Sequence, residues 1–291
     1  MTFTGSPSFD QAVAGFLAGA ASTLVLHPLD LIKTRFQVNE HRPRSILALC
    51  AHIRRHEGPA ALYRGVSANL AGACVSWGLY FWWYGLIKES MRSTVPLSAG
   101  QHLLASATAG AACALLTNPL WVVKTRMCAA PATHPGAYAS LAAGLVAVAR
   151  SEGLRGLYRG LVPALFGVSH GALQFMAYEE LKIRSAAVSP STDLGTPEYI
   201  AMAASSKLFA TVCTYPYQVV RARLQNQYGG PKYTTVRGTI TTIWRNEGVR
   251  GFYKGLAPNV LRVLPGTMIT FAVYEALSKF FRAQGSRSAG P

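Results

Sequence analysis

One sequence unit occurs three times along this chain. Two short motifs recur, and each occurs in three copies. The first contains a Glu-Gly pair and closes on a base and a glycine: HEGPAALYRG (56–65), SEGLRGLYRG (151–160) and NEGVRGFYKG (246–255). The second contains a proline: HPLDLIKTRFQ (27–37), NPLWVVKTRMC (118–128) and YPYQVVRARLQ (215–225). The glutamates are 95 residues apart both times and the prolines 91 and 97, so two independent motifs share one period. This predicts three similar units packed around a common centre.

Each unit contains two long apolar segments. The first segments, each with a proline near its end, span residues 11–37, 100–128 and 198–226, and the second segments span 66–89, 161–184 and 256–280. All are longer than the roughly 20 residues that a helix needs to cross a bilayer. Between them lies a short amphipathic stretch, such as 141–150, which we expect to lie along the membrane surface. The pattern predicts an all-α membrane protein with six transmembrane helices.

The charge of the chain points to an anionic partner. Lys and Arg number 28 against 12 Asp and Glu, yet only 14% of all residues are charged, compared with about 25% in soluble domains. Nucleic acid, acidic lipid and a charged small molecule are the partners that such an excess favours. The basic residues lie at helix ends and not along one face, which argues against nucleic acid. No GxSxG, HExxH or P-loop string occurs, and the five cysteines form no metal motif, so we expect neither an enzyme nor a metal site.

The tripled Pro-x-acid-x-x-base and Glu-Gly motifs resemble those of the mitochondrial carrier family. The resemblance implies three pseudo-symmetric repeats, at residues 8–92, 98–186 and 195–283. It implies a monomer in the mitochondrial inner membrane, whose central cavity opens to each side in turn. It also implies a bound lipid, cardiolipin being the expected one. Each repeat would add one short amphipathic helix on the matrix side.

The charged residues after each proline would form a matrix-side gate. A charge is costly inside a membrane, so these residues should pair between helices and mark function. The resemblance implies that Asp30 pairs with Lys124. Trp121 replaces the second acid and leaves Arg221 without an ionic partner, while Gln218 replaces the third and leaves Lys33 a neutral hydrogen bond. Gln37 and Gln225 match the family's bracing glutamine position, whereas Cys128, at this position in the second repeat, does not.

A second gate is implied on the cytoplasmic side, where the family has aromatic-acid-x-x-base. Its members are Tyr84, Lys88, Tyr178, Glu179, Lys182, Tyr274 and Glu275. Gly85 and Ser278 replace an acid and a base, so Glu275 with Lys88 is the one full pair expected. Weak gates lower the barrier to switching. We therefore expect acids restored at Trp121 and Gln218 to slow transport, measured as initial uptake rates in liposomes.

The expected solute is a flat anionic cofactor. Trp121 resembles the residue found in carriers of nucleotide-like cofactors, and strings such as SWGLYFWWY (76–84) resemble carriers of FAD or folate, with NAD, pyrimidine nucleotides and coenzyme A as alternatives. No prosthetic group is expected. The candidate contact residues are Arg262, Lys207, Gly167, Val168, His170, Gln174, Trp77 and Phe81.

These residue types suit such a solute, and each also has a structural explanation. Arg262 offers a bidentate fork for phosphate or carboxylate, or else supports the bundle. Lys207 faces the cavity or extends toward the membrane interface. Gly167 admits a planar base close to the backbone, or serves ordinary helix packing. Trp77 and Phe81 stack on a ring, or belong to an interfacial aromatic belt.

Overall fold

The computed structural model describes residues 7–39, 45–91, 99–131, 133–134, 136–188, 196–226 and 232–287, and this part of the chain is helical without strands. The long helices are α1 (Pro7–Val38), α3 (Val66–Ser90), α4 (Ala99–Ala129), α7 (Gly167–Val188), α8 (Thr196–Gln225) and α10 (Leu256–Arg287). The short ones are α2 (Ile46–His56), η1 (Pro59–Tyr63), α5 (Leu141–Leu157), α6 (Leu161–Leu165), α9 (Val236–Glu247) and η2 (Val249–Tyr253). The architecture is thus the expected three repeats of two long helices each.

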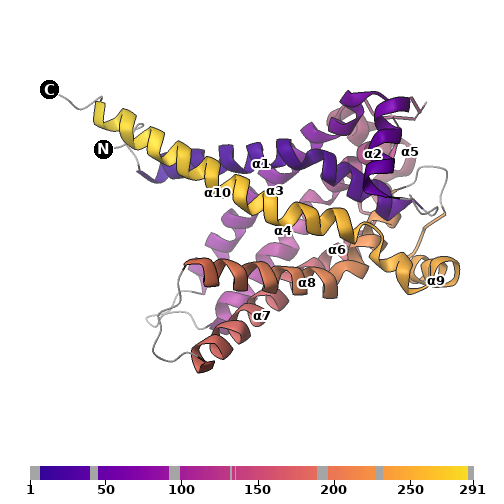
Figure 1. Cartoon of the computed structure of the whole chain (residues 1–291). Helices are drawn as coiled ribbons and strands as arrows, with labels where there is room; N and C mark the ends of the chain where they lie inside the picture. The colour runs from indigo at the N-terminus through magenta and orange to yellow at the C-terminus, as the bar shows by residue number, and fades with distance from the viewer. Residues whose placement is uncertain are drawn as a thin grey trace.

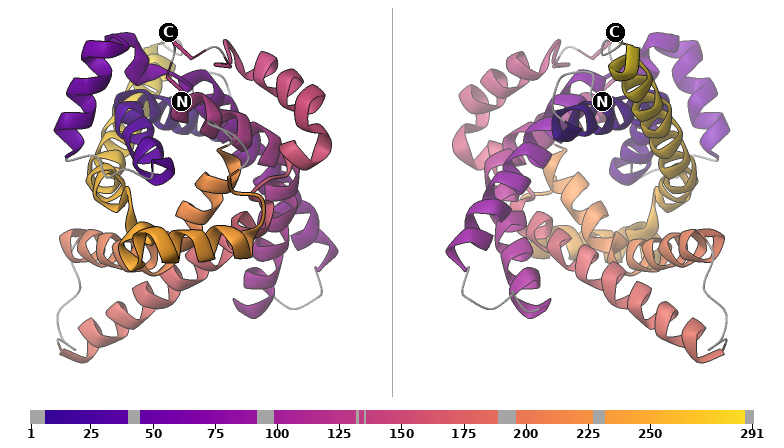
Figure 2. Two further views of the ribbon diagram at one scale, coloured as in Figure 1. Left: turned by 90° about the vertical axis from the view of Figure 1, so that its right-hand side faces the viewer. Right: turned by 90° about the vertical axis from the view of Figure 1, so that its left-hand side faces the viewer.

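The six long helices form a closed ring. Within each repeat the two long helices pair as α1 with α3, α4 with α7, and α8 with α10. Between repeats, α3 lies beside α4, α7 beside α8, and α10 beside α1, which closes the ring. Figure 2 looks along this ring from both ends. In Figure 1 the three surface helices α2, α5 and α9 lie at the end opposite the chain termini. The ring therefore has a surface-helix end and a terminal end.

Most of the long helices are apolar enough to cross a membrane. In the described residues the segments Val13–Val38, Pro59–Ser90, Gly100–Ala129 and Val249–Phe281 meet this test, and α5 with the bent continuation Leu161–Ser185 would add a fifth. Helix α8 is equally long, at 30 residues, but more polar. The chain is a multi-pass membrane protein.

Two expected boundaries differ from the structure. The segment 161–184, expected to be one helix, is interrupted at Phe166, whose carbonyl accepts hydrogen bonds from both the backbone and the hydroxyl of Ser169. The surface stretch expected at 141–150 continues to Leu157 across Gly153, where φ is 64°. The proposed repeat limits at residues 92, 98 and 195 lie outside the described residues.

Each surface helix is anchored by one apolar residue that recurs with the repeat. Ile53, Val148 and Ile243 are all fully buried. Ile53 contacts the cluster around Leu31 on α1, and Val148 and Ile243 contact the equivalent clusters on α4 and α8. A hydroxyl caps the start of each surface helix, as when Ser45 accepts a hydrogen bond from the Ala48 amide. Burial of this one face holds the surface helices against the ring.

The closing glycine of each first motif contacts the next repeat. Gly65, Gly160 and Gly255 have φ of 79°, 73° and 84°, a conformation that side chains rarely adopt. A Cβ on Gly65 would lie 3.0 Å from the sulfur of Cys128, and one on Gly255 would lie 2.9 Å from the backbone oxygen of Lys33. Only glycine therefore permits the repeats to approach so closely at the surface-helix end.

We expect Gly255→Ala to destabilise the protein more than Gly65→Ala. Both substitutions introduce the strain of a positive φ, about 1–2 kcal/mol. The methyl group at Gly255 additionally meets a backbone oxygen, whereas the group at Gly65 meets a thiol that can rotate, and overpacking adds about 1–3 kcal/mol. Unfolding temperatures of the two variants in detergent measure the difference. Equal losses would contradict the close approach at Gly255.

Candidate functional site

A polar cavity of about 310 Å³ lies where α1, α4 and α8 converge, at the surface-helix end. Its lining includes all six residues of the expected matrix gate and both bracing glutamines: Asp30, Lys33, Trp121, Lys124, Gln218, Arg221, Gln37 and Gln225. Thr34, Asn69, Thr125, Tyr217, Ala222 and Arg262 complete it. We call it the gate pocket. The fold thus gathers residues up to 232 positions apart in the chain.

Asp30 has a different partner from the one expected. Its carboxylate forms an ion pair with Arg262 of α10 at 2.8 Å and accepts a hydrogen bond from Asn69 at 3.4 Å. The expected pair with Lys124 is therefore wrong for this structure. The physical reason is that α10 packs along α1, which brings the long guanidinium of Arg262 to the buried carboxylate. Arg262 keeps 39% of its side-chain surface exposed, while Asp30 keeps 5%.

The second connection across the gate pocket is neutral. Lys33 donates a hydrogen bond to Oε1 of Gln218 at 3.1 Å, which joins α1 to α8 as expected. The ammonium of Lys33 also lies 5.9 Å from the ring centre of Tyr215. The substitution of an acid by Gln218 thus preserves the contact between helices but removes its charge.

Trp121 bonds to α3 and forms no hydrogen bond with Arg221. Its indole Nε1 donates to Oγ of Ser76 at 3.2 Å, and its ring covers Gly72 on α3. Lys124 and Arg221 form neither a hydrogen bond nor an ion pair with the described part of the chain, and the Nε atom of Arg221 is buried. Among the described residues Lys124 on α4 and Arg221 on α8 are therefore cations of the gate pocket without a carboxylate partner.

The bracing positions take part in a ring of hydrogen bonds. Gln37 donates to the Tyr215 hydroxyl at 3.1 Å, and Gln225 accepts from Thr125 at 2.8 Å. The backbone carbonyls of this position, at Gln37, Cys128 and Gln225, each accept from an arginine of the preceding repeat in the ring. These donors are Arg223, Arg35 and Arg126, at 3.0, 3.1 and 2.9 Å. Cys128 thus keeps the backbone half of the contact although its side chain differs.

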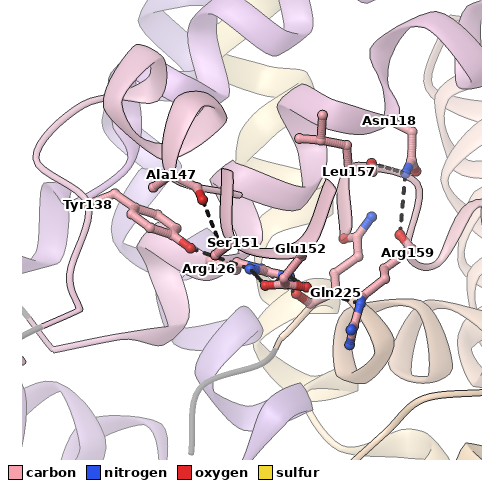
Figure 3. A network of polar contacts seen from close by, with 9 residues as sticks. All are labelled: Asn118, Arg126, Tyr138, Ala147, Ser151, Glu152, Leu157, Arg159 and Gln225. Carbon is pink, nitrogen blue, oxygen red and sulfur yellow. Dashed lines mark hydrogen bonds and ion pairs between the residues drawn. The ribbon is translucent and has the colours of Figure 1, made fainter. Parts of the chain in front are cut away.

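The same buried arginines form ion pairs with partly buried glutamates, which the sequence analysis missed. Arg35 pairs with Glu57, Arg126 with Glu152, and Arg223 with Glu247, each through two hydrogen bonds. Figure 3 shows the repeat 2 copy, where Tyr138 and Arg159 also reach the Arg126–Glu152 pair. The signal was present in both motifs, since each contains one charge of the pair in all three copies. These pairs fasten each surface helix to its own long helix.

At the terminal end the expected gate residues do not meet. Glu275 pairs with Lys279 on its own helix at 2.8 Å, so the expected pair with Lys88 is wrong for this structure. Among the described residues Lys88, Glu179 and Lys182 form no ion pair, and Tyr84 bonds to His102 at 2.9 Å. Tyr178 and Tyr274 are partly buried. The reason is geometric, because the long helices converge at the surface-helix end, whereas at the terminal end Lys88, Glu179 and Glu275 lie on three different helices, α3, α7 and α10.

The candidate solute-contact residues fall into two groups. Gly167 faces the hydroxyl of Tyr217, and Val168 packs against Gly110, so both have ordinary helix contacts. His170 bonds to the Thr214 hydroxyl at 2.9 Å and is thereby held to α8. Lys207 and Gln174 are half-buried.

The aromatic candidates remain open to a partner. Trp77 and Phe81 are each 62% exposed and stack on each other with ring centres 5.7 Å apart. Both belong to α3, where Tyr80 and Tyr84 form a second stacked pair. The helix thus presents a continuous aromatic surface.

Comparison with known proteins shows the family, and several relatives are named for the solute that they carry. The family model described as "Mitochondrial carrier protein" matches residues 5–94, 95–186 and 192–285. Folate transporter 1, chloroplastic, of Arabidopsis thaliana is 42% identical, over 94% of this chain and 96% of the relative. Nicotinamide adenine dinucleotide transporter 2, mitochondrial, of the same plant is 40% identical, over 94% and 79%. The mitochondrial FAD carrier protein FLX1 of Saccharomyces cerevisiae is 35% identical, over 94% and 97%.

Proposed function

The chain belongs to the mitochondrial carrier family, and from this premise we propose that it carries FAD or folate across the mitochondrial inner membrane by alternating access. At the level of the family it is a transporter and not an enzyme. Relatives that carry folate, FAD and NAD support a cofactor as the solute.

The charge of the gate pocket is the observation that carries this proposal. Four cations and one carboxylate line it, so an anionic solute is favoured there. We propose that Arg262, which lines the pocket and is partly exposed, binds the phosphate or carboxylate end of the solute. Lys207, His170 and Gln174 would contact its polar edges.

Competition in reconstituted liposomes tests the solute. Uptake of labelled FAD is measured against unlabelled folate, NAD, a pyrimidine nucleotide and coenzyme A. We expect FAD to be taken up and folate to compete most strongly. Stronger competition by NAD would favour the alternative that the NAD-carrying relatives support. No uptake of any of these solutes would refute the solute assignment and leave the family intact.

We predict that the aromatic surface of α3 contributes to affinity for the flat ring. The double variant Trp77→Leu, Phe81→Leu should raise the half-saturation concentration of FAD about tenfold, because stacking on each ring contributes roughly 0.5–1.5 kcal/mol. Trp82, 57% exposed on another face of the same helix, is the matched control. If Trp82→Leu has the same effect, these rings act only through the membrane interface.

We also propose that the protein acts as a monomer with bound cardiolipin. A cavity of about 590 Å³ lies between the start of α2 and the start of α10. Ser45, Arg250 and Lys254 are among its lining residues. Helix N-termini and nearby cations suit lipid phosphates, and purified protein should retain this lipid through mild detergent.

A further inference from the structure

The gate pocket contains more cationic side chains than its own carboxylate and amide oxygens can bind. Asp30 is its one carboxylate, and Arg262 and Asn69 already bind it. Lys33 donates to Gln218. Lys124 and Arg221 also line the pocket, and both interact electrostatically with Lys33. Neither has an acceptor within the described residues, so two cations line the same pocket without a carboxylate partner.

Two buried donors in the same pocket also lack partners. The Nε atom of Arg221 and the Nε2 atom of Gln225 are buried and make no hydrogen bond. Gln225 is 2% exposed and its other side-chain atom, Oε1, is held by Thr125 at 2.8 Å, which fixes the direction of the amide. A buried unpaired donor destabilises a protein by about 1–3 kcal/mol, so such donors normally have an acceptor.

The missing acceptor is explained by Trp121. It stands at the position that Asp30 occupies in repeat 1, two residues after the proline. An indole is a donor only, and that of Trp121 is directed to Ser76. The chain itself therefore supplies no carboxylate to Lys124 and Arg221.

We propose that a small anion binds in the gate pocket between Lys124, Arg221 and Gln225, in place of the carboxylate that Trp121 lacks. The chemistry suits a halide or a phosphate-type oxyanion, whether a free ion or the anionic group of the solute. Bound there, it connects α4 with α8 at the surface-helix end and stabilises the convergence of the long helices. This assigns a ligand to the gate itself and goes beyond the proposed solute transport.

Unfolding temperature in detergent tests the site. The purified protein is heated in chloride, in phosphate and in gluconate at one ionic strength, and a further sample in gluconate receives FAD. We expect chloride or phosphate to raise the unfolding temperature by about 2–4 °C, because a ligand that binds only the folded state stabilises it. Trp121→Asp supplies a carboxylate, and Arg221→Gln removes one of the two cations of the site, so both should abolish the shift. Arg184→Gln, in an exposed ion pair with Glu180, is the matched control and should keep it.

Comparison of the four samples identifies the source of the anion. A shift with chloride or phosphate alone identifies a free ion, and a shift with FAD alone identifies the solute's own group. Either supports the site if Trp121→Asp removes it. No shift with any of the three, or an unchanged shift in Trp121→Asp, overturns the proposal. If Arg221→Gln does not fold, Lys124→Gln replaces it as the variant that removes a cation from the site. Since uptake is measured separately, the site can fail while the transport proposal stands.

Discussion

Replacing Arg262 by alanine is expected to reduce solute uptake about 100-fold without unfolding the protein. The guanidinium forms an ion pair with Asp30 across the gate pocket and is partly exposed to it. Its removal takes away the proposed anion contact and leaves a nearly buried carboxylate with only Asn69. Loss of one partner of such a pair is worth about 2–5 kcal/mol, and about 2.7 kcal/mol corresponds to 100-fold. Initial uptake rates in liposomes measure the loss.

Two further variants separate solute binding from gate closure. Arg262→Lys keeps the charge but not the bidentate fork, and should keep partial activity. The double variant Asp30→Asn, Arg262→Ala removes both charges of the pair. If Arg262 only neutralises Asp30, the double variant should recover uptake. If Arg262 binds solute, it should stay inactive, as we expect. Unchanged uptake in Arg262→Ala would remove this residue from the site.

Replacing Arg223 by leucine should be among the most destabilising single changes in the chain. Its side chain is fully buried and bonds to Glu247, to the Tyr233 hydroxyl and to the Gln37 carbonyl. Leucine leaves the buried Glu247 carboxylate without its main partner, which destabilises a protein by about 3–5 kcal/mol. In detergent this should lower the unfolding temperature by about 10 °C.

Arg184→Leu provides the comparison for that loss. Arg184 pairs with Glu180 at 2.7 Å, but the two side chains are 76% and 56% exposed, and such pairs contribute about 0–1 kcal/mol. Its unfolding temperature should stay close to that of the unmodified protein. Similar losses in Arg184→Leu and Arg223→Leu would contradict the structural role of the buried pair.

Acid sensitivity gives an independent measure of the same pair. Burial raises the pKa of Glu247, but hydrogen bonds from Arg223 and Lys254 outweigh this and hold the pKa below its ordinary value. Because the folded pKa is lowered, the resulting stability is present above the ordinary pKa and is lost as the pH falls through the lowered one. In Arg223→Leu the unfolding temperature should therefore fall less steeply as the pH is lowered than it does in the unmodified protein.

The architecture of this protein could be predicted from the sequence because the motifs that determine it recur at regular spacing. The repeated proline and Glu-Gly motifs predicted the three-repeat architecture, and long apolar segments predicted the six long helices. The i, i+3 spacing of Asp30 and Lys33 placed both on the face that lines the gate pocket. Such features depend on spacing along one chain segment, which a sequence records directly.

The tertiary structure alone decided which side chains meet between repeats. Asp30 binds Arg262 and not Lys124, Glu275 binds Lys279 and not Lys88, and Trp121 binds Ser76. Each outcome depends on how far neighbouring helices are tilted and displaced along their axes, a quantity set by packing of the whole ring. The sequence lists the charges near each end of the bundle, but only the packed helices determine their distances and therefore their partners.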